Sequence, residues 1–128
     1  MQSHYILLAH GSKDPLWCQT LAEGLESMRE LLTQPVSLAY MELASPSLEE
    51  LVESRYQFGD RHFTVLPLFF AAGRHLLVDV PAQLQALKQH YGDTEFVLNE
   101  PLGKDYTFWQ FLAASINQQL PVEPEQKT

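Results

Sequence analysis

The sequence predicts an α/β protein in which a four-stranded parallel sheet has helices on both faces. Two observations support this fold class. Short apolar runs alternate with longer segments whose apolar residues recur at helical spacing, and one of the short runs is apolar on both of its faces. A strand that is buried on both faces is typical of the centre of a parallel sheet. Right-handed crossovers then favour the strand order 2-1-3-4.

The N-terminal third of the chain predicts a strand, a helix and a second strand. Apolar residues form the first strand at 5–9 and the second at 36–41. Between them lies a helix for which Ser12 is the expected N-cap, and Pro35 follows its end. This helix carries one apolar stripe, which consists of Trp17, Leu21, Leu25, Met28 and Leu32.

The second helix is expected to begin near Ser45. Serine is a good N-cap, and Pro46 suits the first helical position. Glu49 and Glu50 then lie in the first turn, where the helix dipole favours carboxylates. Gly59 ends the helix. The apolar stripe consists of Leu48, Leu51, Val52 and Tyr56.

The second half of the chain repeats this alternation. The run at 63–70 suits the central strand, although Pro67 removes a ladder hydrogen bond and predicts a bulge or early fraying. A third helix is expected with Asp79 as its N-cap and Gly92 at its end, followed by a strand at 95–98 and a fourth helix. The stripes of these two helices are Val80, Leu84, Leu87 and Tyr91, and then Trp109, Leu112, Ala113, Ile116 and Leu120.

Length and composition favour one compact cytoplasmic domain. The chain has 128 residues, and we expect a single domain over 1–120 with a disordered tail at 121–128. The net charge of −8 argues against nucleic acid as a partner, because a nucleic-acid binder needs a positive footprint. No apolar stretch is long enough to span a membrane, and the single cysteine, Cys18, has no partner for a disulfide within the chain.

Two of the predicted strands run into turns that carry a histidine. His10 follows the first strand, and His75 follows the third. Ligands of open α/β sheets bind outside the carboxyl ends of the strands, and strands one and three are neighbours in the expected order, so these histidines are predicted to share one site. Glu42 follows the second strand at the same edge. Imidazole binds divalent transition metals and accepts protons near neutral pH, which indicates metal or proton chemistry.

The same edge gathers positive charge in an acidic chain. Three of the eight lysines and arginines, namely Lys13, Arg74 and Lys104, fall in the loops there, where they would attract an anionic ligand. Structural interpretations stay open beside these functional ones. The basic side chains are also consistent with solvated charge, Glu42 with an ordinary loop carboxylate, and the pair Phe69–Phe70 with the core.

Three separated motifs recur in the order of a known family. The first is Leu8-Ala9-His10-Gly11-Ser12-Lys13-Asp14-Pro15, the second is Met41-Glu42-Leu43 followed by Pro46-Ser47-Leu48, and the third is Val65-Leu66-Pro67-Leu68-Phe69 with Gly73, His75, Asp79 and Pro81. On these motifs the sequence resembles the class II chelatases, in particular the small CbiX/SirB-type sirohydrochlorin chelatases. The resemblance runs from the first strand to about Gly103, most of the chain.

The resemblance implies a single-lobe, chelatase-like (flavodoxin-like) three-layer sandwich. It also implies an ATP-independent lyase that inserts Co²⁺ or Fe²⁺, or Ni²⁺ in some members, into sirohydrochlorin or a related tetrapyrrole. The metal is then a substrate, and no organic cofactor is expected. The family's paired histidines are matched by His10 and His75, which would bind the metal and help to remove the pyrrole protons, and Glu42 would assist as an acidic site residue.

The resemblance further implies which residues bind the substrate and which partner the chain has. A single-lobe chain is expected to form a homodimer that holds the macrocycle in its cleft. The carboxylates of sirohydrochlorin would suit the residues expected to bind the substrate, which are Ser12, Lys13, Arg74 and Lys104.

The run Leu76-Leu77-Val78 departs from relatives, which often have polar or basic residues at these positions. An apolar run there suits packing against a macrocycle face or a partner subunit. It also favours an alternative function, that of a catalytically degenerate protein which binds or carries metal or tetrapyrrole. A hydrolase that uses Ser12 and His10 is disfavoured, because the glycine pattern around Ser12 is not a nucleophile elbow.

Overall fold

The sheet has the strand order that the sequence predicts. The computed structural model describes residues 3–119, apart from the side chains of His75 and Leu77. Its four strands pair in parallel in the order β2-β1-β3-β4, so β1 and β3 are neighbours. The strands are β1 (Ser3–Ala9), β2 (Val36–Tyr40), β3 (His62–Pro67) and β4 (Glu95–Leu98).

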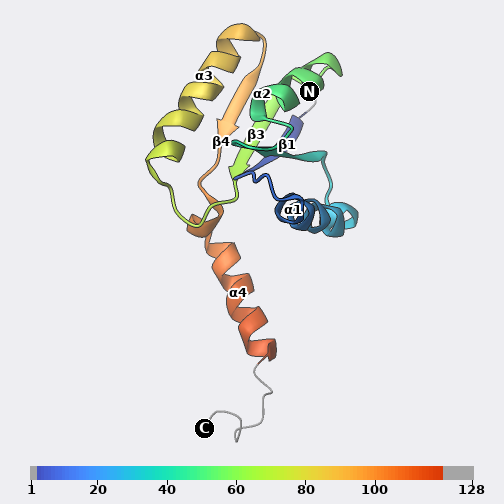
Figure 1. Cartoon of the computed structure of the whole chain (residues 1–128), viewed down its shortest axis with the longest axis vertical. Helices are drawn as coiled ribbons and strands as arrows, with labels where there is room; N and C mark the ends of the chain where they lie inside the picture. The colour runs from blue at the N-terminus through green and yellow to red at the C-terminus, as the bar shows by residue number, and fades with distance from the viewer. Residues whose placement is uncertain (1–2, 120–128) are drawn as a thin grey trace, which may run out of the picture.

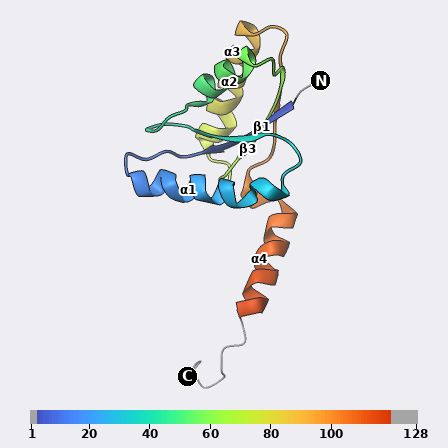
Figure 2. The same ribbon diagram turned by 90° about the vertical axis from the view of Figure 1, so that its right-hand side faces the viewer.

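The helices lie on both sides of this sheet. Figures 1 and 2 show α2 and α3 together on one side, α1 on the other, and α4 extending away from the sheet. Within residues 3–119, no helix combines the length and apolar character needed to cross a bilayer. The helical elements are α1 (Pro15–Met28), η1 (Arg29–Leu31), α2 (Leu48–Gln57), η2 (His75–Asp79), α3 (Val80–His90), η3 (Leu102–Lys104) and α4 (Tyr106–Gln119).

The main core lies between the sheet and the pair α2 and α3. Sheet side chains that point to this side are almost completely buried, as Ile6, Phe63 and Val65 show with exposures of 0–1%. They pack against Val52 of α2 and Val80 of α3, which are also fully buried. In β3 the burial alternates, so the residues that point towards α1 are only half-buried.

Proline ends the central strand, as expected. β3 stops at Pro67, three residues before the predicted end of the run at 63–70. Proline has no N–H to donate to the ladder. The next N–H, that of Leu68, still donates to the carbonyl of Leu8 at 2.8 Å, so the chain follows β1 a little further as it enters the loop.

The predicted N-cap of α2 is wrong by two residues. Ser47 is the cap, and its Oγ accepts from the N–H of Glu50 while the Glu50 carboxylate accepts from the N–H of Ser47. Ser45 and Pro46 therefore stay outside the helix. The reason is tertiary, because the carbonyl of Pro46 accepts the N–H of Tyr40 at 2.9 Å and extends the pairing with β2. Glu49 and Glu50 lie in the first turn, as predicted.

The predicted cap of α1 is wrong, whereas α3 begins directly after Asp79, as predicted. Asp14 caps α1, because its Oδ1 accepts from the N–H of Leu16 at 3.0 Å, while the Oγ of Ser12 accepts from the N–H of Asp14. The backbone of Asp79 is itself helical, because the chain already turns as η2 from residue 75. α3 ends at His90, close to the predicted stop. Leu120 and the predicted tail at 121–128 lie outside the described residues.

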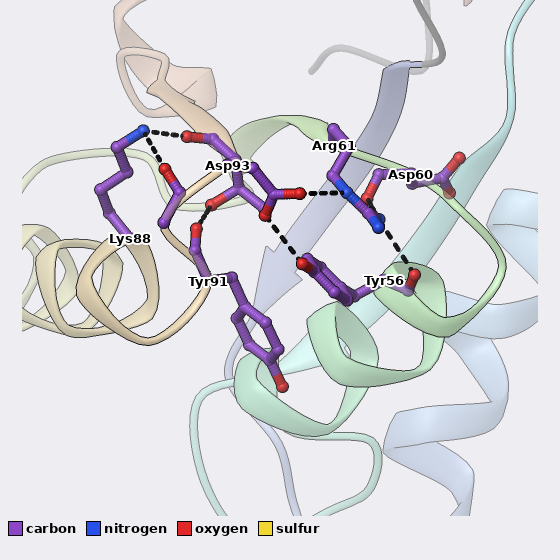
Figure 3. Close-up of polar contacts among 8 residues, drawn as sticks. Tyr56, Asp60, Arg61, Lys88, Tyr91 and Asp93 are labelled. Carbon is purple, nitrogen blue, oxygen red and sulfur yellow. Dashed lines mark hydrogen bonds and ion pairs between the residues drawn. The ribbon is translucent and has the colours of Figure 1, made fainter.

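A polar network holds the two turns at the amino ends of β3 and β4 together (Figure 3). The hydroxyl of Tyr56 donates to Oδ1 of Asp93 at 2.7 Å, and Nε of Arg61 donates to Oδ2 of the same carboxylate at 2.9 Å. The Arg61 guanidinium lies 3.7 Å from the centre of the Tyr56 ring. The ammonium of Lys88 donates to the carbonyl of Thr94. These contacts fix the sheet at the edge opposite to the one where the histidine loops leave it.

A buried histidine lies near this network. His4 is 2% exposed, and its Nε2 is 2.7 Å from Oγ of Ser37. Its Nδ1 is 3.5 Å from a carboxylate oxygen of Asp60, and that oxygen also accepts from Nε of Arg55 at 2.7 Å. Burial, together with the positive charge of Arg55, lowers the pKa of His4 below its ordinary value of 6.5.

The lowered pKa of His4 predicts that acid weakens the fold. Below about pH 6.5 the unfolded chain binds a proton at His4 that the folded chain does not, so the free energy of unfolding should fall as the pH drops from about 7 to about 5. Urea denaturation across this range measures the effect. The variant His4→Gln should lose this part of the slope, and His90→Gln, at an exposed position, should retain it. Equal slopes in all three proteins would contradict the prediction.

Candidate functional site

The loops after β1 and β2 touch at the carboxyl edge of the sheet. The N–H of Met41 donates to the carbonyl of Ala9 at 2.8 Å, so the pairing continues to the point where both loops begin. Gly11 then approaches the second loop so closely that a Cβ atom there would lie 1.9 Å from the carbonyl oxygen of Glu42. Glycine is the residue that permits this approach, and the approach brings His10 beside Glu42.

His10 and Glu42 form a solvent-accessible pair. Nδ1 of His10 is 3.0 Å from Oε1 of Glu42, and the N–H of Gly11 donates to Oε2 at 3.1 Å. The side chains of His10 and Glu42 are 56% and 46% exposed. Partial burial raises the pKa of Glu42, but the hydrogen bonds from Gly11 and His10 outweigh it and hold this pKa below its ordinary value. The carboxylate is therefore ionised at neutral pH.

The ionised carboxylate determines which nitrogen of His10 is available. A neutral imidazole carries one N–H and one lone pair. Because Oε1 of Glu42 accepts a hydrogen bond from Nδ1, the proton is held on Nδ1 and the lone pair is left on Nε2. His10 can thus bind a metal ion or accept a proton through Nε2 while Glu42 fixes its ring.

An apolar recess of about 520 Å³ opens beside His10. The ring centre of Phe69 is 4.5 Å from that of His10, with the planes tilted by 39°. Nε1 of Trp17 donates to the carbonyl of His10 at 2.8 Å, which holds the indole at the edge of the recess. The large apolar side chains that line it are Trp17, Leu21, Met41, Leu68, Phe69, Phe70 and Leu76.

The other predicted site residues are placed less directly. The backbone of His75 begins η2 in the segment that follows β3, but its side chain lies outside the described part, so its pairing with His10 stays a prediction. Lys104 is paired with Glu100 at 3.6 Å, and Lys13 and Arg74 are exposed in the loops of this edge. Among the described side chains, none of these three cations contacts His10 or Glu42.

Ser12 has a structural partner rather than a catalytic one. Its Oγ accepts the N–H of Asp14 at 3.0 Å, and among the described contacts it has none with the imidazole of His10. A hydrolase would need its nucleophile within hydrogen-bond reach of its base.

The residues of the apolar run after His75 differ in burial. Leu76 is buried in the core at 6% exposure, and Val78 is 59% exposed.

Two aromatic residues of the site, Trp17 and Phe70, lie outside the core position that the sequence predicts for them. The apolar stripe predicts Trp17 in the core, but its side chain is 49% exposed and lines the recess. Phe69 packs against the core, as its apolar run predicts, and also contacts His10, whereas Phe70 is 70% exposed. A signal for Trp17 does exist in the sequence: an indole N–H at the start of a helix needs an acceptor, and the preceding loop contains His10.

The described part of the chain thus defines a class of protein. It is a doubly wound α/β protein with an exposed imidazole–carboxylate pair beside an apolar recess, at the point where the strand order reverses. Among the described side chains, no group of three or more His, Cys, Asp or Glu residues is arranged to hold a metal ion. The donors that the structure describes at this site are those of His10 and Glu42.

Comparison with known proteins gives the family. The CbiX family model matches residues 4–119, and the chain therefore belongs to the CbiX family. It is 28% identical over 118 residues to the sirohydrochlorin cobaltochelatase of Sulfolobus acidocaldarius. This match covers 92% of this chain and 93% of that protein. It is 25% identical over 114 residues to the sirohydrochlorin ferrochelatase of Priestia megaterium, and the match spans 88% of this chain but only 43% of that longer protein.

Solved structures agree with this assignment. A proposed cobalamin (vitamin B12) biosynthesis CbiX protein from Marinobacter aquaeolei has 39% sequence identity and a TM-score of 0.83, with 94% of this chain and 96% of that chain covered. The sirohydrochlorin chelatase SirB from Bacillus subtilis subspecies spizizenii, in complex with cobalt, has a TM-score of 0.78 at 21% identity. That match covers 92% of this chain and 51% of SirB, and it supports the fold alone.

The close approach of Gly11 to Glu42 predicts a local and costly substitution. In Gly11→Ala the added Cβ must push the second loop away, so we expect the free energy of unfolding to fall by about 1–3 kcal/mol. Gly24→Ala in α1 is the matched control, because a Cβ there meets nothing within 4 Å and alanine favours a helix by up to about 1 kcal/mol. Urea denaturation measures both variants. Equal stability of the two proteins would contradict the described loop contact.

Proposed function

We propose that this chain is an ATP-independent metal chelatase, a lyase that inserts Co²⁺, Fe²⁺ or Ni²⁺ into sirohydrochlorin or a related tetrapyrrole. Its membership of the CbiX family supports this class of reaction, since the relatives described above are a cobaltochelatase and a ferrochelatase of sirohydrochlorin. The single observation on which the proposal depends is the pairing of His10 with Glu42 beside the apolar recess.

In this proposal the metal ion, a substrate, binds to Nε2 of His10. The hydrogen bond from Nδ1 to Glu42 keeps the lone pair on Nε2, so Glu42 acts as a positioning residue. His75 supplies the second imidazole from the segment after β3. An exposed histidine suits a metal that must be released to a second substrate, because water and the incoming ligand can reach it.

The apolar recess suits one face of a flat macrocycle. Phe69 and Trp17 offer aromatic surface beside His10, and aromatic rings pack well in offset or tilted stacks. Lys13, Arg74 and Lys104 lie in loops of the same edge, where they would attract the peripheral carboxylates of the tetrapyrrole. Ser12 would add a hydroxyl donor, since its Oγ lies in the first of these loops.

Metal insertion requires the two imidazoles both to bind the metal ion and to accept protons. Two pyrrole N–H protons leave the macrocycle as one divalent ion enters, so the exchange leaves the total charge unchanged. A lone pair on an imidazole either binds the metal or accepts a proton, and it cannot do both at once. We therefore propose that His10 and His75 exchange these roles during insertion, with solvent as the final acceptor of the protons.

We also propose that the active unit is a homodimer of a single domain over residues 1–120, working in the cytoplasm. The support is the family resemblance, in which a single lobe is expected to pair with a second copy, and the match covers 43% of the ferrochelatase of Priestia megaterium and 51% of SirB. Two copies would supply two facing edges, with the macrocycle in the cleft between them. The site would then need residues from both copies.

Removing either imidazole should abolish metal insertion. We expect His10→Ala and His75→Ala to lower the rate at least about 100-fold, and Glu42→Gln, which keeps the shape but removes the charge, to lower it about 10–100-fold. The measurement is the absorbance change of sirohydrochlorin with Co²⁺, Fe²⁺ or Ni²⁺. His90→Gln is the matched control and should keep full activity. Full activity in both imidazole variants with every metal would overturn the mechanism.

The same assay separates the enzyme from a carrier. The exposed Val78, in the run that departs from relatives, favours the alternative of a degenerate protein that only binds tetrapyrrole or metal. Binding of sirohydrochlorin in a one-to-one ratio with no metal insertion would support the carrier. Insertion over many turnovers would support the chelatase.

A further inference from the structure

One face of the sheet is covered only in part. On the side of α1, the sheet residues Tyr5 and Leu66 are half-buried, and Val97 of β4 is 54% exposed. Tyr5 and Leu66 line an open recess of about 320 Å³ with Met28 and Leu31 from the end of α1 and η1. Central parallel strands are normally covered on both faces. This open face, defined by these five residues, therefore lacks a second helix beside α1.

The helix α4 does not pack on the sheet of its own chain. Figures 1 and 2 show it running away from the strands, and within the described residues its main contacts are with η3. None of its residues is buried, and Trp109 and Ile116 of its apolar stripe are 46% and 50% exposed. It contains no charged residue, although the chain carries a net charge of −8. Such a helix is suited to burial against a partner.

The start of α4 is fixed by packing. The N–H of Gly103 donates to the carbonyl of Phe69 at 2.9 Å, and a Cβ at Gly103 would lie 1.7 Å from the carbonyl oxygen of Phe70. Nε1 of Trp109 donates to the carbonyl of Gly103, and the rings of Phe70 and Phe108 are 5.9 Å apart. Folding α4 back onto its own sheet would break these contacts. A second copy, by contrast, can receive α4 without disturbing them.

We propose that α4 of one copy packs on the open face of a second copy, and that the second copy returns its own α4 in the same way. The inference rests on the homodimer of the proposed function and names its contact surface. Figure 1 shows α4 continuing beyond the carboxyl ends of the strands. A two-fold rotation that makes these edges face each other turns α4 antiparallel to the partner's strands, as crossover helices of this fold run.

Length and charge fit this exchange. The 14 residues of α4 span about 21 Å, and the six residues of β3 span about 20 Å, so the helix matches the strand that it would cover. Two copies with a net charge of −8 each repel one another, but α4 contains no charged residue, so the helix adds nothing to this repulsion at the contact. The exchange also sets the two recesses beside His10 on opposite sides of one cleft, because both lie at the carboxyl edges.

Crosslinking between two differently labelled copies tests the exchange. In a Cys18→Ser background, one copy carries Val97→Cys and the other Ile116→Cys, and the two are produced together and treated with a short bis-maleimide. Each copy then has one cysteine, so a link between positions 97 and 116 joins two copies. We expect mass spectrometry to find this link in excess over links between identical positions. Links between two copies of position 116 alone, or no links, would overturn the inference.

Fold-back of the helix has its own readout. A single chain that carries both Val97→Cys and Ile116→Cys, treated at high dilution, would close on itself if α4 returned to its own sheet. A product with the mass of one chain and an internal link would overturn the proposal. A product with the mass of two chains, in which position 97 is linked to position 116, would support it.

Charge placed on the apolar stripe gives an independent test. Ile116→Glu should weaken dimerisation at least tenfold in sedimentation velocity, and Gln118→Glu, the same charge on the opposite side of α4, should leave it unchanged. Equal effects of both variants would overturn the inference. These measurements need neither metal nor tetrapyrrole, so loss of the chelatase hypothesis leaves them valid. A dimer without the link between 97 and 116 would refute the exchange and leave the homodimer standing.

Discussion

The parallel pairing of β1 with both β2 and β3 is the interaction on which the rest of the structure depends. It places three strand ends side by side, so that residues from three distant parts of the chain leave the sheet at one edge. His10 meets Glu42 across 32 positions of sequence only because Ala9 and Met41 are bonded in that ladder. The close approach of Gly11 then tightens the contact.

The polar groups at the two edges of the sheet differ in how far they are paired and exposed. At the amino edge, Arg61, Tyr56 and Asp93 satisfy one another, and the buried His4 lies against Asp60. At the carboxyl edge, His10 and Glu42 remain exposed, and aromatic surface stays open around them. The polar groups of the amino edge are thus paired with one another, whereas those of the carboxyl edge remain accessible, as the proposed function requires.

Local features of the structure could be predicted from the sequence, whereas features that depend on contacts between distant elements could not. Apolar periodicity is local, and it predicted all four strands and four helices and, with the handedness of crossovers, the strand order. The cap of α2 was missed because it depends on a contact with another element. Ser47 replaces Ser45 as the N-cap of α2 because Pro46 bonds to Tyr40, whereas α3 starts directly after Asp79, as predicted, although η2 already makes the backbone of Asp79 helical. The placement of Glu42 beside His10 agrees with the expectation that both lie at one edge.

By itself, the sequence determined the fold class, the order of the strands and the edge at which His10 and Glu42 emerge, because these follow from periodicity and chain handedness. Only the tertiary structure decided that Trp17 lies outside the core at the recess, that Phe69 contacts His10 from the margin of the core, and that α4 leaves its own sheet. An apolar stripe predicts that one face of a helix is buried, but it does not predict which element the helix packs against. That choice depends on packing between distant segments, such as Gly103 against Phe70, which no local pattern encodes.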